Sequence, residues 1–255
     1  MSSVIHPTAI VEPGAILGDG CVIHPGAIIK ACAELGEGCI VHPYAVVGGD
    51  PQALRFDMAT PTRVRVGART TIREYVTINR SLKPEVPTIV GSDCLLMACS
   101  HVAHDCILGD RIVVANAVLL AGHVHVANHV ILGGASAYHQ FSRIGEGAMV
   151  GGTSRITLDV PPFTIVVERT ELVGLNLIGL KRRGCSRETI KEVKSAFREV
   201  YGTAGNIREI AAAMLASGTY QSLEARLFLE FFTKGERGIA RPRKKGANAD
   251  EADEG

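Results

Sequence analysis

A period of six residues dominates this sequence. Branched aliphatic residues recur at every sixth position in a first run, which comprises Ile5, Val11, Leu17, Ile23, Ile29, Leu35, Val41 and Val47. The spacing returns in a second run with Tyr138 as its single exception, comprising Val90, Leu96, Val102, Leu108, Val114, Leu120, Val126, Leu132, Tyr138, Ile144, Val150 and Ile156. A helix of period 3.6 or a strand of period two does not account for this pattern. A coil with three short, equivalent faces does, because each hexad then forms one face and one corner.

The pattern predicts a mainly β fold, a parallel β-helix shaped as a triangular prism with eighteen residues per circuit. The large aliphatic residue of each hexad points into the prism, and the fifth residue, which is small, fills the space near a corner. Four of the seven cysteines occupy that fifth position: Cys21, Cys39, Cys94 and Cys106. With an odd count and no C-x-x-C pair, we interpret them as buried filler rather than as metal ligands or disulfides.

Composition limits the classes of function. The 255 residues are 46% hydrophobic with a mean hydropathy of +0.18, and no run approaches the eighteen apolar residues of a membrane span. The hexads begin at Ile5 and leave no room for a signal peptide, so we expect a cytoplasmic protein. A formal net charge of +1 excludes a broadly basic surface, and with it nucleic acid as a partner.

Breaks in the hexad count predict the domain organisation. Val47 and Val66 are nineteen residues apart, which indicates an excursion at about 48–63, and a second excursion at about 80–87 keeps the phase. The hexads stop at Val160-Pro161-Pro162. Helices are then predicted from Ser186 to about Tyr201, after the Asn206-x-x-Glu209 cap, and over 223–232. We therefore expect a prism over 1–184, a helical cap over 185–240 and a disordered tail over 241–255.

Six of the nine histidines fall within about two circuits of the predicted prism: His101, His104, His123, His125, His129 and His139. Gly122 follows His104 by eighteen residues, and Gln140 follows Gly122 by eighteen. The three should therefore form a vertical row on one edge, with His123 and His139 beside it. The arithmetic predicts one compact polar site. We interpret His125 and His129 as solvated corner residues.

The row has the components of acid–base chemistry. An imidazole at His104 can take a proton near neutral pH, and Asp105 is a partner that can fix its tautomer if a corner brings the two together. The glycine one layer away, Gly122, lets its backbone N–H approach a reacting carbonyl closely, as stabilisation of an oxyanion requires. Metal binding is the competing use of such a cluster, through His101-x-x-His104 or His125-x-x-x-His129, but we expect no metal and no cofactor.

The motifs resemble one family. The segments His101-Val-Ala-His104-Asp105-Cys106, Ala121-Gly122-His123-Val124, His139-Gln140-Phe141, Asp159-Val-Pro-Pro162 and Gly179-Leu-Lys-Arg-Arg-Gly184 are similar, in order and nearly in spacing, to the UDP-N-acetylglucosamine 3-O-acyltransferases of lipid A biosynthesis. The resemblance covers about residues 4–235. It implies a left-handed β-helix and a homotrimer with sites between prisms. It also implies transfer of an acyl chain, with or without a 3-hydroxyl, from acyl carrier protein to the sugar 3-hydroxyl.

The resemblance also assigns roles residue by residue. His104 would be the general base, Asp105 would orient it, and the Gly122 N–H would hold the oxyanion. The residues matching substrate contacts are Gln52, Arg55, His101, His123, His139, Gln140, Asn176, Arg182 and Arg183, and Gly152 would limit the depth of the acyl pocket. Lys181, Arg182 and Arg183 have a simpler interpretation as a solvated cluster at a helix start. With Arg187, Lys191, Lys194 and Arg198 they could instead face the acidic carrier protein.

Several positions depart from the family pattern. Ala53 and Arg55 stand where the family has an aspartate and a lysine, Asn79 replaces a histidine, Ile178 replaces a glutamate, and Glu168-Arg169-Thr170 replaces a Gly-Asn turn. These departures gather at positions that contact the sugar nucleotide. Two alternatives therefore stay open beside the O-acyltransferase hypothesis: N-acylation of a 3-amino sugar analogue, and a non-catalytic scaffold that binds a nucleotide sugar.

Overall fold

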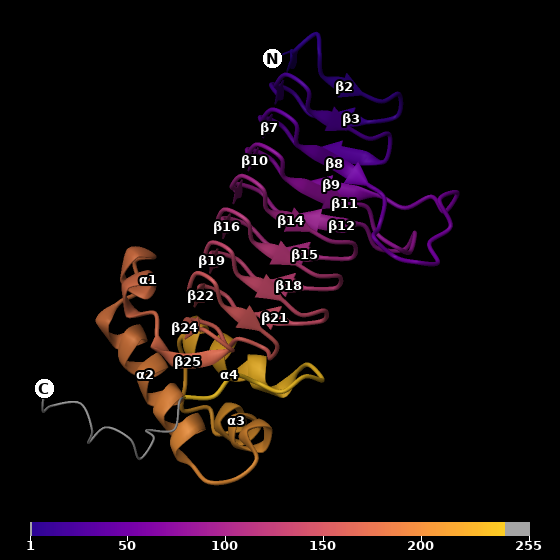
Figure 1. Ribbon diagram of the computed structural model, residues 1–255. Helices are drawn as coiled ribbons and strands as arrows, with labels where there is room; N and C mark the ends of the chain where they lie inside the picture. The colour runs from indigo at the N-terminus through magenta and orange to yellow at the C-terminus, as the bar shows by residue number, and fades with distance from the viewer. Residues whose placement is uncertain (1, 243–255) are drawn as a thin grey trace, which may run out of the picture.

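The computed structural model describes residues 2–242. Stacked coils form a long prism, and helices gather at its C-terminal end (Figure 1). No helix within residues 2–242 is both long and apolar enough to span a bilayer. The greater part of the predicted tail, residues 243–255, lies outside the described residues.

Three sheets make up the faces of the prism. Sheet A has ten strands in the order β1 (Val4–Ile5), β4 (Val22–Ile23), β7 (Ile40–Val41), β10 (Thr71–Ile72), β13 (Leu95–Leu96), β16 (Val113–Val114), β19 (Ile131–Leu132), β22 (Met149–Val150), β24 (Thr164–Val167) and β25 (Glu171–Leu175). Sheet B has eight: β2 (Ile10–Val11), β5 (Ile28–Ile29), β8 (Val46–Gly49), β11 (Thr77–Asn79), β14 (His101–Val102), β17 (Leu119–Leu120), β20 (Ala137–Tyr138) and β23 (Arg155–Ile156). Sheet C has seven: β3 (Ile16–Leu17), β6 (Ala33–Leu35), β9 (Val64–Val66), β12 (Thr88–Val90), β15 (Ile107–Leu108), β18 (His125–Val126) and β21 (Arg143–Ile144).

Strand register confirms the predicted circuit. Val4 pairs in parallel with Val22, and Leu119 pairs with Ala137, so each regular circuit returns after eighteen residues. The chain visits sheets A, B and C in turn, and the fold is the predicted left-handed parallel β-helix. Because neighbouring coils pair as parallel strands, residues eighteen apart in the sequence lie directly above one another.

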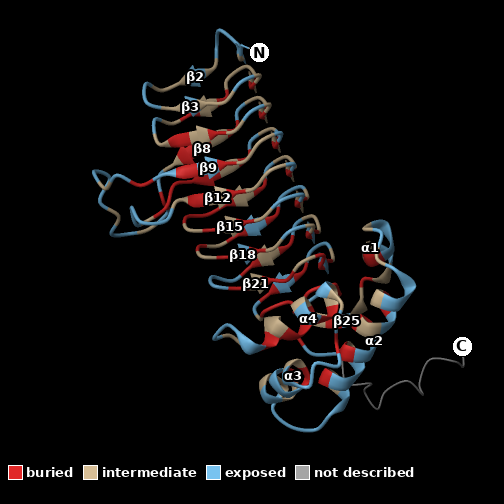
Figure 2. Cartoon of the chain, turned by 180° about the vertical axis from the view of Figure 1, so that it is seen from behind, coloured by how far each residue is buried: buried red, intermediate tan, exposed pale blue. Residues whose placement is uncertain are grey.

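The inward aliphatic residues form one continuous core (Figure 2). Burial of each such side chain contributes roughly 1.5–3 kcal/mol, so each circuit after the exposed first one adds three such contributions. Tyr138, the exception in the hexad pattern, is also buried, and its hydroxyl oxygen accepts a hydrogen bond from the Ser136 hydroxyl at 3.0 Å. Cys21, Cys39, Cys94 and Cys106 are buried free thiols, which confirms their prediction as filler.

The corners depend on a left-handed backbone at the fourth position of the hexad. In the later hexads non-glycine residues take this conformation, among them Asp105 (φ 59°), His123 (φ 61°) and Phe141 (φ 65°). Such a conformation costs an L-residue roughly 1–2 kcal/mol, and the ladder on both sides of the corner holds it in place. The reversal of direction brings the third and fourth side chains of a hexad closer together than a flat strand would allow.

Both excursions leave the prism at the corner between sheets B and C. The first connects β8 to β9 and lengthens its circuit, so that Thr71 pairs with Ile40, 31 positions earlier. The second connects β11 to β12, and Ile72 pairs with Leu96, 24 positions later. In Figure 1 both loops project from the same side of the prism.

The coil continues past the point where the hexad pattern ends, within the range of 1–184 predicted for the prism. The coil does not stop at Pro161-Pro162, because β24 adds a further parallel strand to sheet A and Val160 still bridges Ile144. In earlier circuits the second amide of a hexad donates to the next coil, as Ala121 N–H does to the Tyr138 carbonyl. Pro161 lacks that donor at a point where no further coil follows, so proline is tolerated there. An antiparallel β24–β25 hairpin, absent from the prediction, then completes sheet A.

The three predicted helices are present as α2 (Arg187–Gly202), α3 (Ile207–Ala216) and α4 (Leu223–Thr233). Ser186 caps α2 by accepting a hydrogen bond from the Thr189 N–H, and Asn206 caps α3 through the Arg208 N–H. The helices share their own apolar core, and Phe197 and Tyr201 of α2 also pack against the prism core. α2 therefore covers the last coil.

A short helix that was not predicted, α1 (Leu177–Arg182), precedes α2. Asn176 caps its N-terminus, so Lys181, Arg182 and Arg183 lie at its C-terminal end, and the alternative interpretation as a helix-start cluster was wrong. Positively charged side chains at a helix C-terminus interact favourably with the negative end of the helix dipole.

Candidate active site

The centre of the site is a His–Asp pair at the corner between sheets B and C. His104 and Asp105 follow β14 as the third and fourth residues of one hexad, and Asp105 has the left-handed backbone. The Nδ1 atom of His104 lies 2.7 Å from a carboxylate oxygen of Asp105, and His104 is 8% exposed. An Nδ1–H that donates to Asp105 leaves Nε2 as the proton acceptor of the ring. The corner thus supplies the contact that a flat strand would forbid.

Gly122 lies directly beneath this imidazole, as the eighteen-residue arithmetic predicts. A Cβ atom on Gly122 would lie 2.4 Å from Cε1 and 2.8 Å from Nε2 of His104. The ladder uses the amides on either side, from Ala121 to the Tyr138 carbonyl and from His123 to the His104 carbonyl. Within residues 2–242 the Gly122 N–H has no hydrogen-bond partner, so a donor without a partner lies on the residue that contacts the His104 ring.

His123 completes a compact polar group. Its ring stacks on Phe141 at a centroid distance of 4.5 Å and meets the His104 ring edge-on at 5.2 Å. Its Nε2 atom is 3.7 Å from the Asp105 carboxylate. Burial lowers the pKa of His123 from its ordinary value, so its imidazole is unprotonated at neutral pH.

His101 lies on β14, on the outer face of sheet B near the same corner. Its Nδ1 atom is 2.7 Å from the hydroxyl of Thr77 in the neighbouring coil. Burial again lowers the pKa of His101. The hydrogen bond and the lowered pKa together favour a fixed, neutral ring.

The second excursion closes over the His–Asp pair. The Leu82 N–H donates to both carboxylate oxygens of Asp105 at 3.2 and 3.3 Å, and the Asp105 N–H donates to the Thr88 hydroxyl at 2.8 Å. The Leu82 contact holds the carboxylate in addition to its contact with His104, and the Thr88 contact holds the backbone. Asp105 is therefore fixed by both the second excursion and β12, as a residue that positions a base should be.

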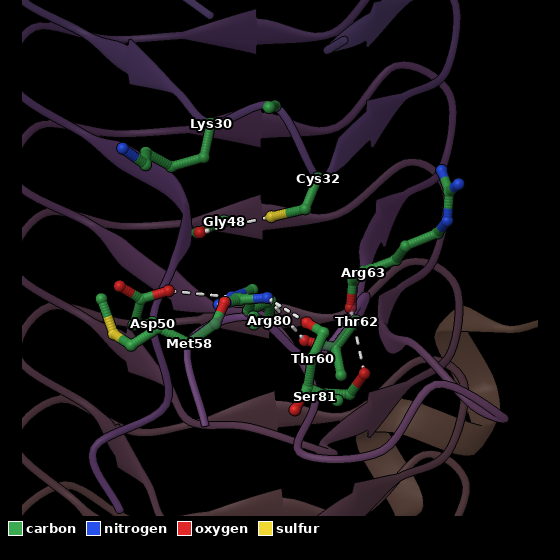
Figure 3. A network of polar contacts seen from close by, with 12 residues as sticks. Lys30, Cys32, Gly48, Asp50, Met58, Thr60, Thr62, Arg63, Arg80 and Ser81 are labelled. Atoms are coloured by element: carbon green, nitrogen blue, oxygen red, sulfur yellow. Dashed lines mark hydrogen bonds and ion pairs between the residues drawn. The ribbon is translucent and has the colours of Figure 1, made fainter. Parts of the chain in front are cut away.

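Arg80 joins the two excursions and was missed by the sequence reasoning. Its buried guanidinium donates to Asp50 at 2.8 Å, to the carbonyls of Met58 and Thr60 at 2.9 and 2.7 Å, and to the Thr62 hydroxyl at 3.2 Å (Figure 3). A signal existed, because Arg80 is the third residue of its hexad, the position that His104 occupies one circuit later. Arginine at that position stabilises the loops beside the site.

Four further predicted residues lie on this edge without a fixed side-chain role. His139 and Gln140 are exposed at the next corner of the row, where the His139 ring nitrogen Nδ1 lies 3.1 Å from the Gln140 carbonyl. Gln52 and Arg55 are exposed in the first excursion, which leaves the prism at the same corner. The structure therefore brings the predicted row together and places the first excursion on its edge.

Other predicted residues lie away from that corner. Gly152 stands between β22 and β23, at the corner of sheets A and B. Asn176 is buried, and its side chain accepts from the Gly179 N–H and donates to the Gly147 carbonyl. Arg183 forms an ion pair with Glu146 over the Phe163 ring, whereas Arg182 is exposed. The contacts of Asn176 and Arg183 are with the corner of sheets C and A, so one chain unites neither these residues nor Gly152 with His104.

The two remaining histidines of the cluster stand apart. His129 lies at the corner of sheets C and A with Nε2 3.3 Å from Arg111, in agreement with its interpretation as a corner residue. His125 was misassigned, because it projects from β18 on the face of sheet C instead of a corner. There it lines a cavity of about 440 Å³ with Phe231 of α4.

Metal-ligating side chains also meet at the His–Asp pair. Within residues 2–242, one group of three such residues has its ligand atoms within 4.8 Å of one another, and it comprises His104, Asp105 and His123. The pairs considered from sequence, His101 with His104 and His125 with His129, do not supply such a group.

Fold and site together define a hexapeptide-repeat transferase. A family model described as bacterial transferase hexapeptide matches residues 14–49, and one described as the second domain of UDP-N-acetylglucosamine O-acyltransferase matches residues 159–240. Within that class, the chain belongs to the UDP-N-acetylglucosamine O-acyltransferase family.

Relatives and solved structures support the assignment. An acyl-[acyl-carrier-protein]–UDP-N-acetylglucosamine O-acyltransferase of Burkholderia lata is 36% identical over 93% of this chain and 99% of its own length. A relative of the same description from Gloeothece citriformis is 41% identical, and the match spans 61% of this chain but 56% of that protein. The UDP-N-acetylglucosamine acyltransferase of Campylobacter jejuni is 32% identical with a TM-score of 0.81, covering 94% of this chain and 100% of that one.

Proposed function

We propose that the protein transfers an acyl chain from acyl carrier protein to the 3-hydroxyl of UDP-N-acetylglucosamine, the first step of lipid A biosynthesis. The observation that supports this most strongly is the meeting of three groups: the His104 Nε2, the Asp105 carboxylate on its Nδ1, and the free Gly122 N–H below. Acyl transfer to an alcohol needs a base, a group that orients it, and a donor for the oxyanion. O-acyl transfer to UDP-N-acetylglucosamine, the activity by which the relatives are described, requires the same three groups.

The reaction follows from these positions. The Nε2 of His104 takes the proton of the sugar 3-hydroxyl while the hydroxyl oxygen attacks the thioester carbonyl. The tetrahedral oxyanion accepts a hydrogen bond from the Gly122 N–H. The carbon–sulfur bond then breaks, and the imidazolium returns its proton to the departing thiolate. The Asp105 carboxylate stabilises the imidazolium between these two steps.

Substrate contacts are proposed along the same edge. His101, His123, His139 and Gln140 line the sugar, and Gln52 and Arg55 approach it from the first excursion. Arg182, exposed at the end of α1, suits a diphosphate oxygen. Asn176 and Arg183 belong to the nucleotide end of the site, where their contacts with Gly147 and Glu146 fix α1 against the prism.

We infer a homotrimer, because one chain separates these groups. His104 is at the corner of sheets B and C, whereas Gly152 and α1 are at the other two corners. The outer face of sheet A is a nearly unbroken apolar row: Val4, Val22, Ile40, Leu95, Val113, Ile131, Met149 and Ile165. A row of this kind is typical of an interface between subunits. Packing of neighbouring prisms through it would complete each site with the Gly152 corner and α1 of the next copy.

The basic face of α2 is proposed to receive acyl carrier protein. Arg187, Lys191, Lys194 and Arg198 follow the spacing of one helical stripe and are exposed, with Lys181 and Arg182 beyond its N-terminal end. Attraction of this kind to an acidic partner falls as salt is added. A cytoplasmic location follows from a carrier-protein donor.

A 3-amino analogue of the sugar is the second candidate acceptor. Asn79, which stands where the family has histidine, is 5% exposed, and its Oδ1 has no hydrogen-bond partner in the described chain. This unpaired acceptor lies next to Arg80, one coil before His104, and a substrate with an additional N–H donor would satisfy it.

One experiment tests the proposal. The full chain is incubated with UDP-N-acetylglucosamine or its 3-amino analogue and a panel of acyl carrier proteins, and products are read by mass spectrometry. We expect one acceptor to be acylated, and His104→Ala to remove most turnover while nucleotide binding and the unfolding midpoint are retained. A wild-type chain that binds nucleotide but acylates neither acceptor would instead be a scaffold.

A further inference from the structure

The His104, Asp105 and His123 group has the spacing of a metal site. The Nδ1 of His104 and the Nε2 of His123 lie 2.7 and 3.7 Å from the same oxygen of Asp105. Tetrahedral Zn²⁺ with bonds of about 2.0–2.1 Å has neighbouring ligands about 3.3 Å apart. The two observed separations bracket that value, and all three ligand atoms lie within 4.8 Å of one another, so a movement of the two histidine side chains would bring them to bonding distance of one ion.

The donors are also prepared for a cation. Two neutral imidazoles and a carboxylate are ligands that Zn²⁺ prefers, with a fourth position left to water. The Leu82 N–H holds the carboxylate, and Phe141 holds the His123 ring by stacking. Rings and carboxylate thus need little ordering on binding, which favours affinity.

We propose that these three residues form an inhibitory site for Zn²⁺, a function separate from the proposed acyl transfer. Metal bound at Nδ1 of His104 excludes the proton that Nδ1 shares with Asp105. A neutral ring must then carry its proton on Nε2, the atom that faces Gly122. The imidazole can no longer accept a proton there, so occupancy by the metal abolishes the base.

Binding is tested with Co²⁺, whose visible absorption reports tetrahedral coordination. The untagged full chain is titrated with Co²⁺, and Zn²⁺ is added to displace it. We expect one saturable tetrahedral site per chain, and His123→Asn to weaken it by at least about 10-fold. His129→Asn, at a different corner, is the matched control and should bind as the wild type does.

Several outcomes would overturn the site. These are an absence of tetrahedral absorption, undiminished binding by His123→Asn, or loss of binding in His129→Asn. Unfolding midpoints of both variants establish that they are folded. If His123→Asn does not fold, His123→Gln replaces it in the same titration.

Inhibition is measured in the acyl-transfer assay and rests on the proposed function. Micromolar Zn²⁺ should lower kcat, a chelator should restore it, and Mg²⁺ should have no effect because it prefers oxygen ligands. Full activity with Zn²⁺ bound would refute inhibition. If no acceptor is acylated at all, the proposed function is wrong, and the cobalt titration alone decides the metal site.

Discussion

Gly122→Ala is the sharpest test of the site geometry. The φ of Gly122 lies outside the left-handed region, so the backbone itself accepts alanine. The added methyl would lie 2.4 Å from Cε1 of His104, where ordinary contacts between carbon atoms are about 3.5 Å or more. The imidazole must therefore move by about 1 Å, and a displacement of that size costs about 100-fold in rate. Disturbance of the Gly122 N–H extends the expected loss in kcat to about 100- to 1,000-fold.

The assay compares kcat and nucleotide affinity of Gly122→Ala with the wild type. We expect kcat to fall while the unfolding midpoint and the dissociation constant of the UDP-sugar change little. Gly174→Ala is the matched control, because a Cβ at Gly174 meets no atom within 4 Å and its φ is also ordinary. Turnover of Gly122→Ala within threefold of the wild type would show that neither the imidazole position nor this amide matters.

Four further predictions follow from other contacts. Asp105→Asn should lower kcat at least about 100-fold with the UDP-sugar affinity retained, since the carboxylate no longer stabilises the imidazolium; equal kcat values would contradict this. Reversal of charge in Lys191→Glu/Lys194→Glu should raise KM for the carrier protein at least about 10-fold at low salt, whereas Arg226→Glu on α4 should not. Arg80→Met should lower the free energy of unfolding in urea by about 2–3 kcal/mol, against less than about 1 kcal/mol for the exposed Arg63→Met, and similar losses would refute a special role for Arg80. Burial lowers the folded-state pKa of five histidines: His42, His101, His123, His125 and His129. Acidification from pH 7 towards 5 should therefore lower the thermal unfolding midpoint, and a midpoint that does not change with pH would contradict this.

The sign of that pH effect follows from proton linkage. A histidine with a lowered folded-state pKa binds fewer protons when folded than when unfolded. Its contribution to stability is therefore complete above the unfolded pKa of about 6.5 and is lost as pH falls below it. Each of the five shifts has burial as its largest cause, so the effects add in one direction.

The repeat explains why so much of the site was predictable. Once the period fixes a circuit of eighteen residues, the stacking of His104, Gly122 and Gln140 follows from their numbers alone. The contact of His104 with Asp105 does not, because it depends on the left-handed backbone of Asp105, which the pattern does not encode. The Leu82 contact was also out of reach, since an excursion has no period from which its path can be inferred.

The C-terminal part was predicted less fully, because it has no repeat from which its contacts can be inferred. The capping residues Ser186 and Asn206 indicate α2 and α3 from the local sequence. By contrast, α1 is six residues long, and its N-terminal cap depends on the buried side chain of Asn176. The β24–β25 hairpin turns through Glu168 and Thr170, both with positive φ but neither glycine. Tertiary contacts impose that turn, so no local signal for it exists in the sequence.

The shared origin of the two excursions has a consequence for how such a protein can change. Coils before and after each loop pair in the same register, so the length of the loop does not change the strand pairing of the other coils. Segments at this edge can be exchanged or lengthened without disturbing the coils, provided that Arg80 and the Leu82 amide keep their partners. The length of the loops beside the candidate site can therefore vary while the stack that holds His104 above Gly122 stays the same.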